Sequence, residues 1–267
     1  MREGGRVDER QIRFNDGAAY ERMMGTWSRL TGEIFLDWVA PQPGLRWIDI
    51  GCGSGALSEL LIKRCAPAEV IGIDPSEEQL AFARARPAAG RASFHQGDAM
   101  SLPFAADRFD AAVMALVLFY VPEPAAGLAE MVRVTAPGGS VSAYVWDLSE
   151  SGSPTEPIHA EMRAMGLNPL RPPSAAASGM GALQHLWFSA GLSAVTAREI
   201  TVSRTFADFD DFWATTIMSP NIGSVVAAMP SDDIAALRTR VQARVPPDAA
   251  GRISYVARAN AISGRVA

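Results

Sequence analysis

Short apolar runs alternate with segments of helical periodicity through the middle of the chain. The apolar runs predict strands at 45–50, 69–74, 92–97, 110–117 and 139–147, and the periodic segments predict helices at 56–65, 77–86 and 124–135. Strands that alternate with helices join through right-handed crossovers, and this gives a doubly wound parallel sheet. The central part of the chain is therefore predicted to be an α/β domain.

Apolar residues also recur at helical spacing before the first strand, between residues 17 and 40. Gly25 and Gly32 interrupt this pattern, which predicts two short helices rather than one. Helices in this place either pack on the sheet or cover a ligand at its edge, and the pattern alone leaves both open. Residues 1–16 are polar and are predicted to be flexible.

The regular alternation stops at residues 148–192, which contain several prolines and helical patches near 156–166 and 179–190. A connection of this length predicts a functional cap. Its Met and aromatic residues suit either a local core or an adaptable pocket for an apolar substrate. The remaining residues, 193–267, predict a strand at 195–203, helices at 206–218 and 231–245, and a last strand at 252–262.

A glycine-rich turn follows the first strand, and acidic residues lie at three successive strand ends. Gly51 and Gly53 free the backbone to turn and to approach a ligand. Asp49, Asp74 and Asp98 are expected to converge at the carboxyl edge of the sheet. The glycine spacing also fits a dinucleotide-binding turn, but an acidic crevice disfavours a pyrophosphate and tolerates a cationic adenosyl sulfonium.

These segments resemble those of the class I S-adenosylmethionine-dependent methyltransferases, in the small-molecule branch called type 11. The stretch 49–55 resembles the first motif of that family, 97–99 its adenine-binding segment, 109–113 its fourth strand, and 136–140 the turn before its fifth strand. The resemblance implies a Rossmann-like sheet of seven mostly parallel strands, with the last strand antiparallel between the fifth and the sixth. It divides the chain into a cofactor-binding core with an N-terminal helical lid at 17–147, the cap at 148–192, and the C-terminal part.

The resemblance also implies S-adenosyl-L-methionine as the cofactor and a set of residues that bind it. These are Tyr20, Met24 and Trp27 in the lid; Asp49, Gly51, Cys52 and Gly53 at the first turn; Asp74 and Pro75; Gly97, Asp98 and Ala99; and Leu116 after the fourth strand. Asp74 would hold the ribose and Asp98 the adenine.

Methyl transfer from a sulfonium needs alignment and the exclusion of water rather than a nucleophilic side chain. An oxygen acceptor would need a general base, for which Tyr20, Tyr120, His159 and His185 are the candidates. Residues 116–120 lack the Asn/Asp-Pro-Pro-aromatic segment of enzymes that methylate nucleobase or amide nitrogens, and no acids there suit a metal. The expected acceptor is a small, apolar molecule methylated at C, O or N, without a metal.

The composition of the chain indicates which binding partners and which cellular compartment to expect. The net charge of −5 and the lack of a basic stripe argue against nucleic-acid binding. Cys52 and Cys65 are interpreted as reduced thiols that pack in the core, and no signal peptide or membrane span is seen, which predicts a cytoplasmic protein. A monomer or a homodimer is expected. The alternatives left open are an NAD(P)-dependent oxidoreductase and a catalytically silent S-adenosylmethionine-binding module.

Overall fold

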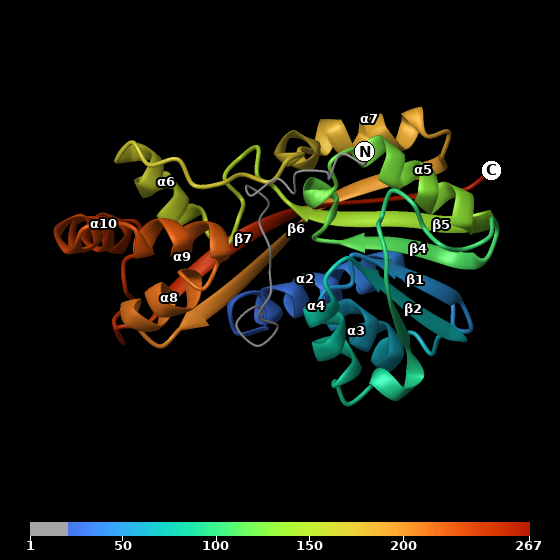
Figure 1. Ribbon diagram of the computed structural model, residues 1–267, viewed down its shortest axis with the longest axis horizontal. Helices are drawn as coiled ribbons and strands as arrows, with labels where there is room; N and C mark the ends of the chain where they lie inside the picture. The colour runs from blue at the N-terminus through green and yellow to red at the C-terminus, as the bar shows by residue number, and fades with distance from the viewer. Residues whose placement is uncertain (1–20) are drawn as a thin grey trace, which may run out of the picture.

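A seven-stranded sheet forms the centre of the protein, in a computed structural model that describes residues 21–267 (Figure 1). The strands are β1 (Arg46–Ile50), β2 (Glu69–Asp74), β3 (Ser93–Gln96), β4 (Phe109–Ala115), β5 (Thr135–Trp146), β6 (Ser193–Phe206) and β7 (Ile253–Arg265). Their order is β3-β2-β1-β4-β5-β7-β6. Strands β1 to β5 pair in parallel, and β7 is antiparallel to both of its neighbours. The predicted methyltransferase-type sheet is confirmed.

Helices cover both faces of this sheet, as a doubly wound fold requires. The covering helices are α2 (Thr26–Val39), α3 (Ala56–Arg64), α4 (Glu77–Arg84), α5 (Pro124–Val134) and α7 (Met180–Ser189). Figure 1 shows α5 and α7 on one face and α2, α3 and α4 on the other. Because the parallel strands are covered twice, their side chains are buried on both faces, as at Ile48 and Val113.

The N-terminal helical region differs from the two short helices that the glycines predicted. A π-helical turn, η1 (Glu21–Gly25), leads into α2, which continues through Gly32. A Cβ atom at Gly32 would lie 2.9 Å from Leu60 Cδ1 and 3.2 Å from Tyr144 Oη. The glycine thus allows α2 to approach α3 and the sheet closely, and it does not end the helix. The predicted flexible segment 1–16 and Tyr20 lie outside the described residues.

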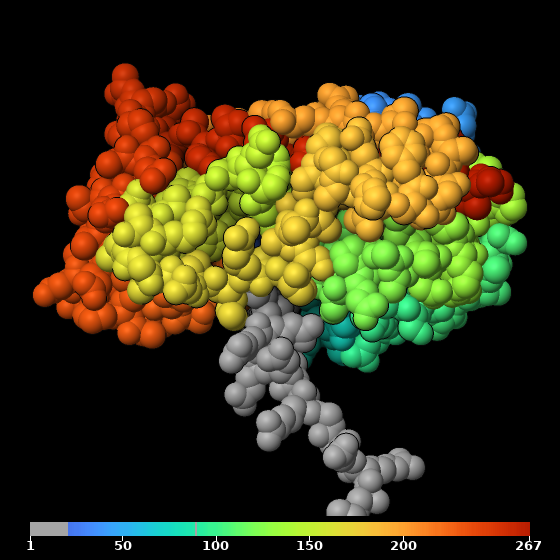
Figure 2. All heavy atoms as spheres, turned by 90° about the horizontal axis from the view of Figure 1, so that it is seen from above, coloured from blue at the N-terminus to red at the C-terminus, as the bar shows by residue number. Residues whose placement is uncertain are grey.

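The stretch 148–192 contributes to two different parts of the structure. Its first helix, α6 (Glu156–Ala164), joins α8 (Phe209–Thr216), α9 (Pro220–Ala227) and α10 (Ser231–Arg244) in a group that we call the helical lobe (Figure 1, left). Its second helix, α7, returns to the sheet, where buried Trp187 donates from Nε1 to the carbonyl of Val141 at 3.0 Å. The segment crosses the top of the molecule in yellow and gold in Figure 2. The apolar face of α7 is therefore local core.

The long strands β6 and β7 pair along their length and support the helical lobe. β6 extends beyond its predicted bounds at both ends, and β7 continues three residues past its predicted end. The predicted helix at 206–218 is the shorter α8, whose first turn is capped by the Asp208 side chain. The next helix, α9, was not predicted and begins at Pro220, while α10 agrees with the predicted helix.

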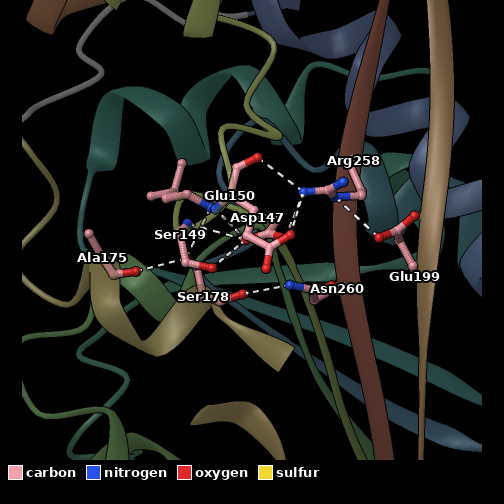
Figure 3. A network of polar contacts seen from close by, with 9 residues as sticks. Asp147, Ser149, Glu150, Ala175, Ser178, Glu199, Arg258 and Asn260 are labelled. Atoms are coloured by element: carbon pink, nitrogen blue, oxygen red, sulfur yellow. Dashed lines mark hydrogen bonds and ion pairs between the residues drawn. The ribbon is translucent and has the colours of Figure 1, made fainter. Parts of the chain in front are cut away.

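The exit from β5 is fixed by a network of polar contacts around Asp147 (Figure 3). The carboxylate of Asp147 accepts hydrogen bonds from the backbone amides of Ser149 and Glu150 and lies 3.2 Å from the Arg258 guanidinium. Burial opposes the ionised form, but hydrogen bonds from the Ser149 hydroxyl and the Glu150 amide, together with the charge of Arg258, lower the pKa of Asp147. Since Arg258 also pairs with Glu199, the start of the connection is tied to both β7 and β6.

Candidate functional site

The glycine-rich turn joins the end of β1 to the start of α3. Gly51, Gly53 and Gly55 have φ of +70°, +51° and +78°, a backbone region that other residues rarely adopt. A Cβ atom at Gly51 would lie 2.4 Å from Val117 Cγ1. The turn therefore lies directly against the loop that follows β4, at the carboxyl edge of the sheet.

Asp49 lies within β1 beside this turn and is fully buried. Ser58 Oγ donates a hydrogen bond of 2.7 Å to its Oδ2, whereas Oδ1 has no hydrogen-bond partner among residues 21–267. Burial raises the pKa of Asp49 to about 7, the charge of Asp74 adds to this effect, and the Ser58 hydrogen bond opposes it. A buried carboxylate with an unpaired oxygen is suited to receive a cation or a hydrogen-bond donor.

Asp74 ends β2 and holds the glycine turn from the neighbouring strand. Its Oδ2 accepts a hydrogen bond from the Gly53 amide at 2.9 Å, and its Oδ1 accepts one from the Ser76 amide at 2.9 Å. Burial raises its pKa, although both hydrogen bonds favour the carboxylate. Asp74 and Asp49 thus lie near enough for their charges to interact, as expected from adjacent strand ends.

The third acid, Asp98, follows β3, the next strand in the sheet. It is exposed, and its Oδ1 accepts a hydrogen bond from the Met100 amide at 2.8 Å. The Gly97 amide donates to the carbonyl of Asp74 at 3.1 Å, which links the segment 97–99 to the end of β2. Pro75 is linked in the same way, since Gln96 Nε2 donates to its carbonyl. The segments around the acids therefore follow one another along one edge.

Leu116, the first residue after β4, has a strained backbone at this edge. Its φ is +62°, and its amide donates a hydrogen bond of 2.7 Å to the carbonyl of Tyr144 in β5. Non-glycine residues hold such conformations only where the surrounding structure imposes them, and they cluster at functional sites. The sequence placed Leu116 beside the cofactor but carried no sign of this conformation.

A small cavity of about 40 Å³ lies between the glycine turn and the ends of β4 and β5. Asp49, Cys52 and Leu116 line it, and so do two residues that the sequence did not single out, Ser28 of α2 and Tyr144. The hydroxyl of Tyr144 within the otherwise apolar run 143–146 was the one available signal. Ser28 lies one residue from Trp27, which was expected to cover the cofactor.

The two described lid residues lie in different surroundings. Trp27 is buried, with its ring edge-on to Trp146 at 6.3 Å and to Tyr255 at 6.4 Å between centroids. Met24 is half-buried and packs against the same core. Trp27 is therefore an element of the core that joins α2 to β5 and β7.

The three candidate bases among the described residues lie on different elements. Tyr20 is outside the described residues, and Tyr120 ends the short helix η3 (Leu118–Tyr120) that follows Leu116. His159 lies in the helical lobe, where burial lowers its pKa to about 4 and where it contacts Thr155 Oγ1 and Asn221 Nδ2. His185 is exposed on α7. Tyr120 is the described candidate nearest in sequence to the crevice.

Residues 21–267 contain no group of three or more His, Cys, Asp or Glu side chains placed to hold a metal ion. Within the same range, every helix is too short or too polar to cross a bilayer.

Comparison with known proteins agrees with the geometry of this edge. Residues 48–143 match the family model described as a methyltransferase domain. Over 171 residues the chain is 34% identical to the 2-phytyl-1,4-naphtoquinone methyltransferase of Synechococcus elongatus, a match that covers 62% of this chain and 71% of that protein.

One further relative matches part of the sequence, and one solved structure has a similar fold. The chain is 36% identical over 121 residues to the ubiquinone/menaquinone biosynthesis C-methyltransferase UbiE of Cereibacter sphaeroides, a match covering 44% of this chain and about half of that protein (48%). The fold resembles that of Haemonchus contortus phosphoethanolamine N-methyltransferase 2, whose structure was solved in complex with S-adenosyl-L-methionine. The TM-score is 0.57 at 16% sequence identity, and the match covers 93% of this chain and 56% of that one. The chain belongs to the class I S-adenosylmethionine-dependent methyltransferases, and S-adenosyl-L-methionine is its cofactor.

Proposed function

We propose that this protein transfers the methyl group of S-adenosylmethionine to a small, largely apolar organic molecule. The observation that carries the proposal is Asp49, a fully buried carboxylate with one unpaired oxygen beside the glycine turn. A cationic ligand at the turn would give this oxygen a partner and would offset the cost of burying the charge.

The residues around the turn suit a cationic cofactor better than a dinucleotide. Asp49 is the charged residue among the described residues that line the cavity, and Lys, Arg and His are missing from that described lining. A pyrophosphate here would meet the charges of Asp49 and Asp74 without a facing cation. An ammonium and a sulfonium would both be favoured in the same place. This chemistry argues against the NAD(P)-dependent alternative.

The cofactor, when bound, supplies a methyl group that is already activated for in-line displacement. Asp49 would attract the positive charge of its amino-acid part, and the bare backbone at Gly51 and Gly53 would permit close approach. Asp74 would orient the ribose hydroxyls while it holds the turn. Leu116 and Tyr144 would form the wall that excludes water from the reacting methyl group, so that alignment supplies the rate enhancement.

We further propose a quinone-like aromatic compound, in its reduced form, as the acceptor class. The support is the family of named relatives, whose names refer to ubiquinone, menaquinone and phytyl-naphthoquinone. A reduced quinone is electron-rich at ring carbon and at oxygen, which makes it a good nucleophile towards a methyl sulfonium. We place the reaction in the cytoplasm, a reducing compartment that fits the two buried, unpaired thiols Cys52 and Cys65.

The test combines calorimetry with a labelled-methyl assay. We expect the protein to bind S-adenosylhomocysteine and not NAD(P), and to transfer labelled methyl groups to a reduced naphthoquinone or benzoquinone. Binding of NAD(P) without S-adenosylhomocysteine would contradict the proposal in favour of the oxidoreductase. Binding of S-adenosylhomocysteine without turnover on quinols, catechols, amines and phenols would favour the silent module.

A further inference from the structure

Arg86, just after α4, connects η1 to the glycine turn and to α3, which directly follows that turn. Its side chain is only 12% exposed. Nη1 pairs with Glu59 of α3 at 2.9 Å, and Nη2 pairs with the Glu21 carboxylate of η1. Nε donates to the backbone carbonyl of Ser54, and Nη2 lies 3.2 Å from Ser54 Oγ. One guanidinium therefore holds α3, η1 and the glycine turn together.

Glu21 completes this connection from the other side. Ser54 Oγ donates a hydrogen bond of 3.3 Å to Glu21 Oε2, so that the carboxylate contacts both Arg86 and the turn. The side chain of Glu21 folds back over Gly25, where an added Cβ atom would lie 2.5 Å from Glu21 Cδ. Gly25 therefore leaves the space that the carboxylate occupies.

A second arginine fixes η1 to the opposite part of the fold. Arg204 of β6 donates from Nη1 to the carbonyl of Met23 at 2.8 Å, and Met23 is itself buried. The five residues of η1 are thus held by Arg86 on the side of the glycine turn and by Arg204 on the side of β6. π-Helical turns of this kind are rare and occur often at functional sites.

The glycine turn is the point where these contacts meet the cofactor site. Ser54 lines the same cavity as Asp49 and Ser28, and it follows Gly53, whose amide is held by Asp74. Glu21 and Arg86 do not line that cavity among the residues described for it. Both side chains instead contact Ser54, which connects them to the turn.

We propose that Glu21 and Arg86 act as a positioning pair that fastens the N-terminal segment to the glycine turn and sets the turn for cofactor binding. This inference rests on the proposed function only in taking S-adenosylmethionine as the ligand of the turn. Charge-assisted hydrogen bonds to a half-buried carboxylate are strong enough to matter, because each broken contact leaves a charged partner behind. The pair thereby couples the order of residues 21–25 to cofactor affinity.

The first experiment compares three variants by calorimetric titration with S-adenosylhomocysteine. Glu21→Gln should weaken binding about tenfold, the effect of one lost charge-assisted hydrogen bond. Gly25→Ala keeps every charge but places a methyl group where the Glu21 carboxylate lies, so it should weaken binding similarly although alanine favours helix. Glu33→Gln is the matched control, because Glu33 forms an exposed pair with Arg29 on α2, away from the turn.

A second measurement separates positioning from mere stability. Hydrogen exchange of residues 21–25 and 53–55, measured without cofactor, should be faster in Glu21→Gln and Gly25→Ala than in the wild type or Glu33→Gln, at unchanged melting temperature. Equal exchange and equal affinity in all four proteins would overturn the proposal. Failure of the wild type to bind S-adenosylhomocysteine would instead contradict the proposed function, and the exchange data would still decide whether the pair orders the turn.

Discussion

The carboxylate of Asp74 accepts a hydrogen bond of 2.9 Å from the backbone amide of Gly53, which lies 21 residues earlier in the chain. The last residue of β2 thereby fixes the turn that follows β1. Its other oxygen accepts from the Ser76 amide, which starts the approach to α4. A residue expected to bind ribose is therefore also part of the scaffold of the glycine turn.

Replacement of Asp74 should accordingly affect both the ligand and the turn. We expect Asp74→Ala to weaken S-adenosylhomocysteine binding by about 1–3 kcal/mol, since the half-buried Gly53 and Ser76 amides lose their acceptor and the ribose loses its partner. Isothermal titration calorimetry measures the affinity. Asp110→Ala is the control, because it removes an acid at the start of β4 that pairs with Arg46 of β1. Equal affinities in the two variants would remove Asp74 from the site.

The pKa of Asp49 predicts a pH-dependent affinity for the cofactor. Burial raises this pKa to about 7, so the carboxyl group is largely protonated below that pH. A bound cation favours the ionised form and lowers the pKa, so binding releases a proton. We expect affinity for S-adenosylhomocysteine to rise with pH up to about 7, the pKa of Asp49 in the free protein, and to level off above it.

Titration calorimetry in two buffers of different ionisation enthalpy would count the released protons. The control is Asp49→Asn, which should bind more weakly and should lose this part of the pH dependence. A wild-type affinity with the same pH dependence as that of Asp49→Asn would show that the carboxyl group does not change its protonation state on binding.

Gly51 and Gly44 allow a direct comparison of backbone strain with steric conflict. Both have positive φ, +70° and +83°, but only at Gly51 would an added Cβ atom meet a neighbour, at 2.4 Å from Val117 Cγ1. Gly51→Ala should therefore lower the free energy of unfolding by about 1–3 kcal/mol more than Gly44→Ala. Urea denaturation measures both. Equal losses would mean that Val117 moves away at no cost.

The arrangement of the acids could be predicted from the sequence because each lies at or beside the end of an apolar strand. Parallel strands bring such ends to one edge, so the pattern alone indicated that Asp49 and Asp74 would lie near each other. The seven-stranded order came from the family resemblance rather than from the pattern. The sequence predicted these features because each depends on local periodicity or on a contiguous motif.

Features that depend on distant contacts were not predicted. Glu21 and Arg86 are 65 residues apart, and nothing in either local pattern indicates that they pair. The break expected at Gly32 is absent because this glycine instead leaves room for Leu60 of α3 and Tyr144 of β5 to approach α2 closely. For α7, a face of Leu and Trp residues fits a pocket as well as a core, and only the contact with Val141 decides between them.

The role of α7 as scaffold leads to a stability prediction. Trp187→Phe removes the Nε1 donor to the Val141 carbonyl and leaves a small void, so the free energy of unfolding should fall by about 1–3 kcal/mol. Affinity for S-adenosylhomocysteine should not change. The control is Phe188→Ala at the adjacent, 64% exposed position, which should alter stability by less than about 0.5 kcal/mol. A loss of cofactor affinity without a loss of stability would place α7 at the site instead.

His159 gives the helical lobe a predicted sensitivity to acid. Its ring contacts Thr155 Oγ1 at 3.3 Å and Asn221 Nδ2 at 3.2 Å, and burial lowers its pKa from 6.5 to about 4. The fold therefore favours the neutral ring. Its contribution to stability is fully present above pH 6.5 and is lost as the pH falls towards 4, amounting to about 3 kcal/mol.

Replacement of His159 by glutamine should therefore reduce the difference in the free energy of unfolding between pH 7 and pH 4.5. Glutamine offers a carbonyl to Asn221 and has no proton to gain, so the acid-induced loss at this position disappears. His185→Gln is the matched control, because His185 is exposed on α7 and its replacement should leave the pH dependence as it is. Urea denaturation of the three proteins at both pH values measures the effect. If His159→Gln lost as much stability in acid as the wild type, the wild-type ring would have to be protonated without unfolding. His159 would then again be a candidate general base.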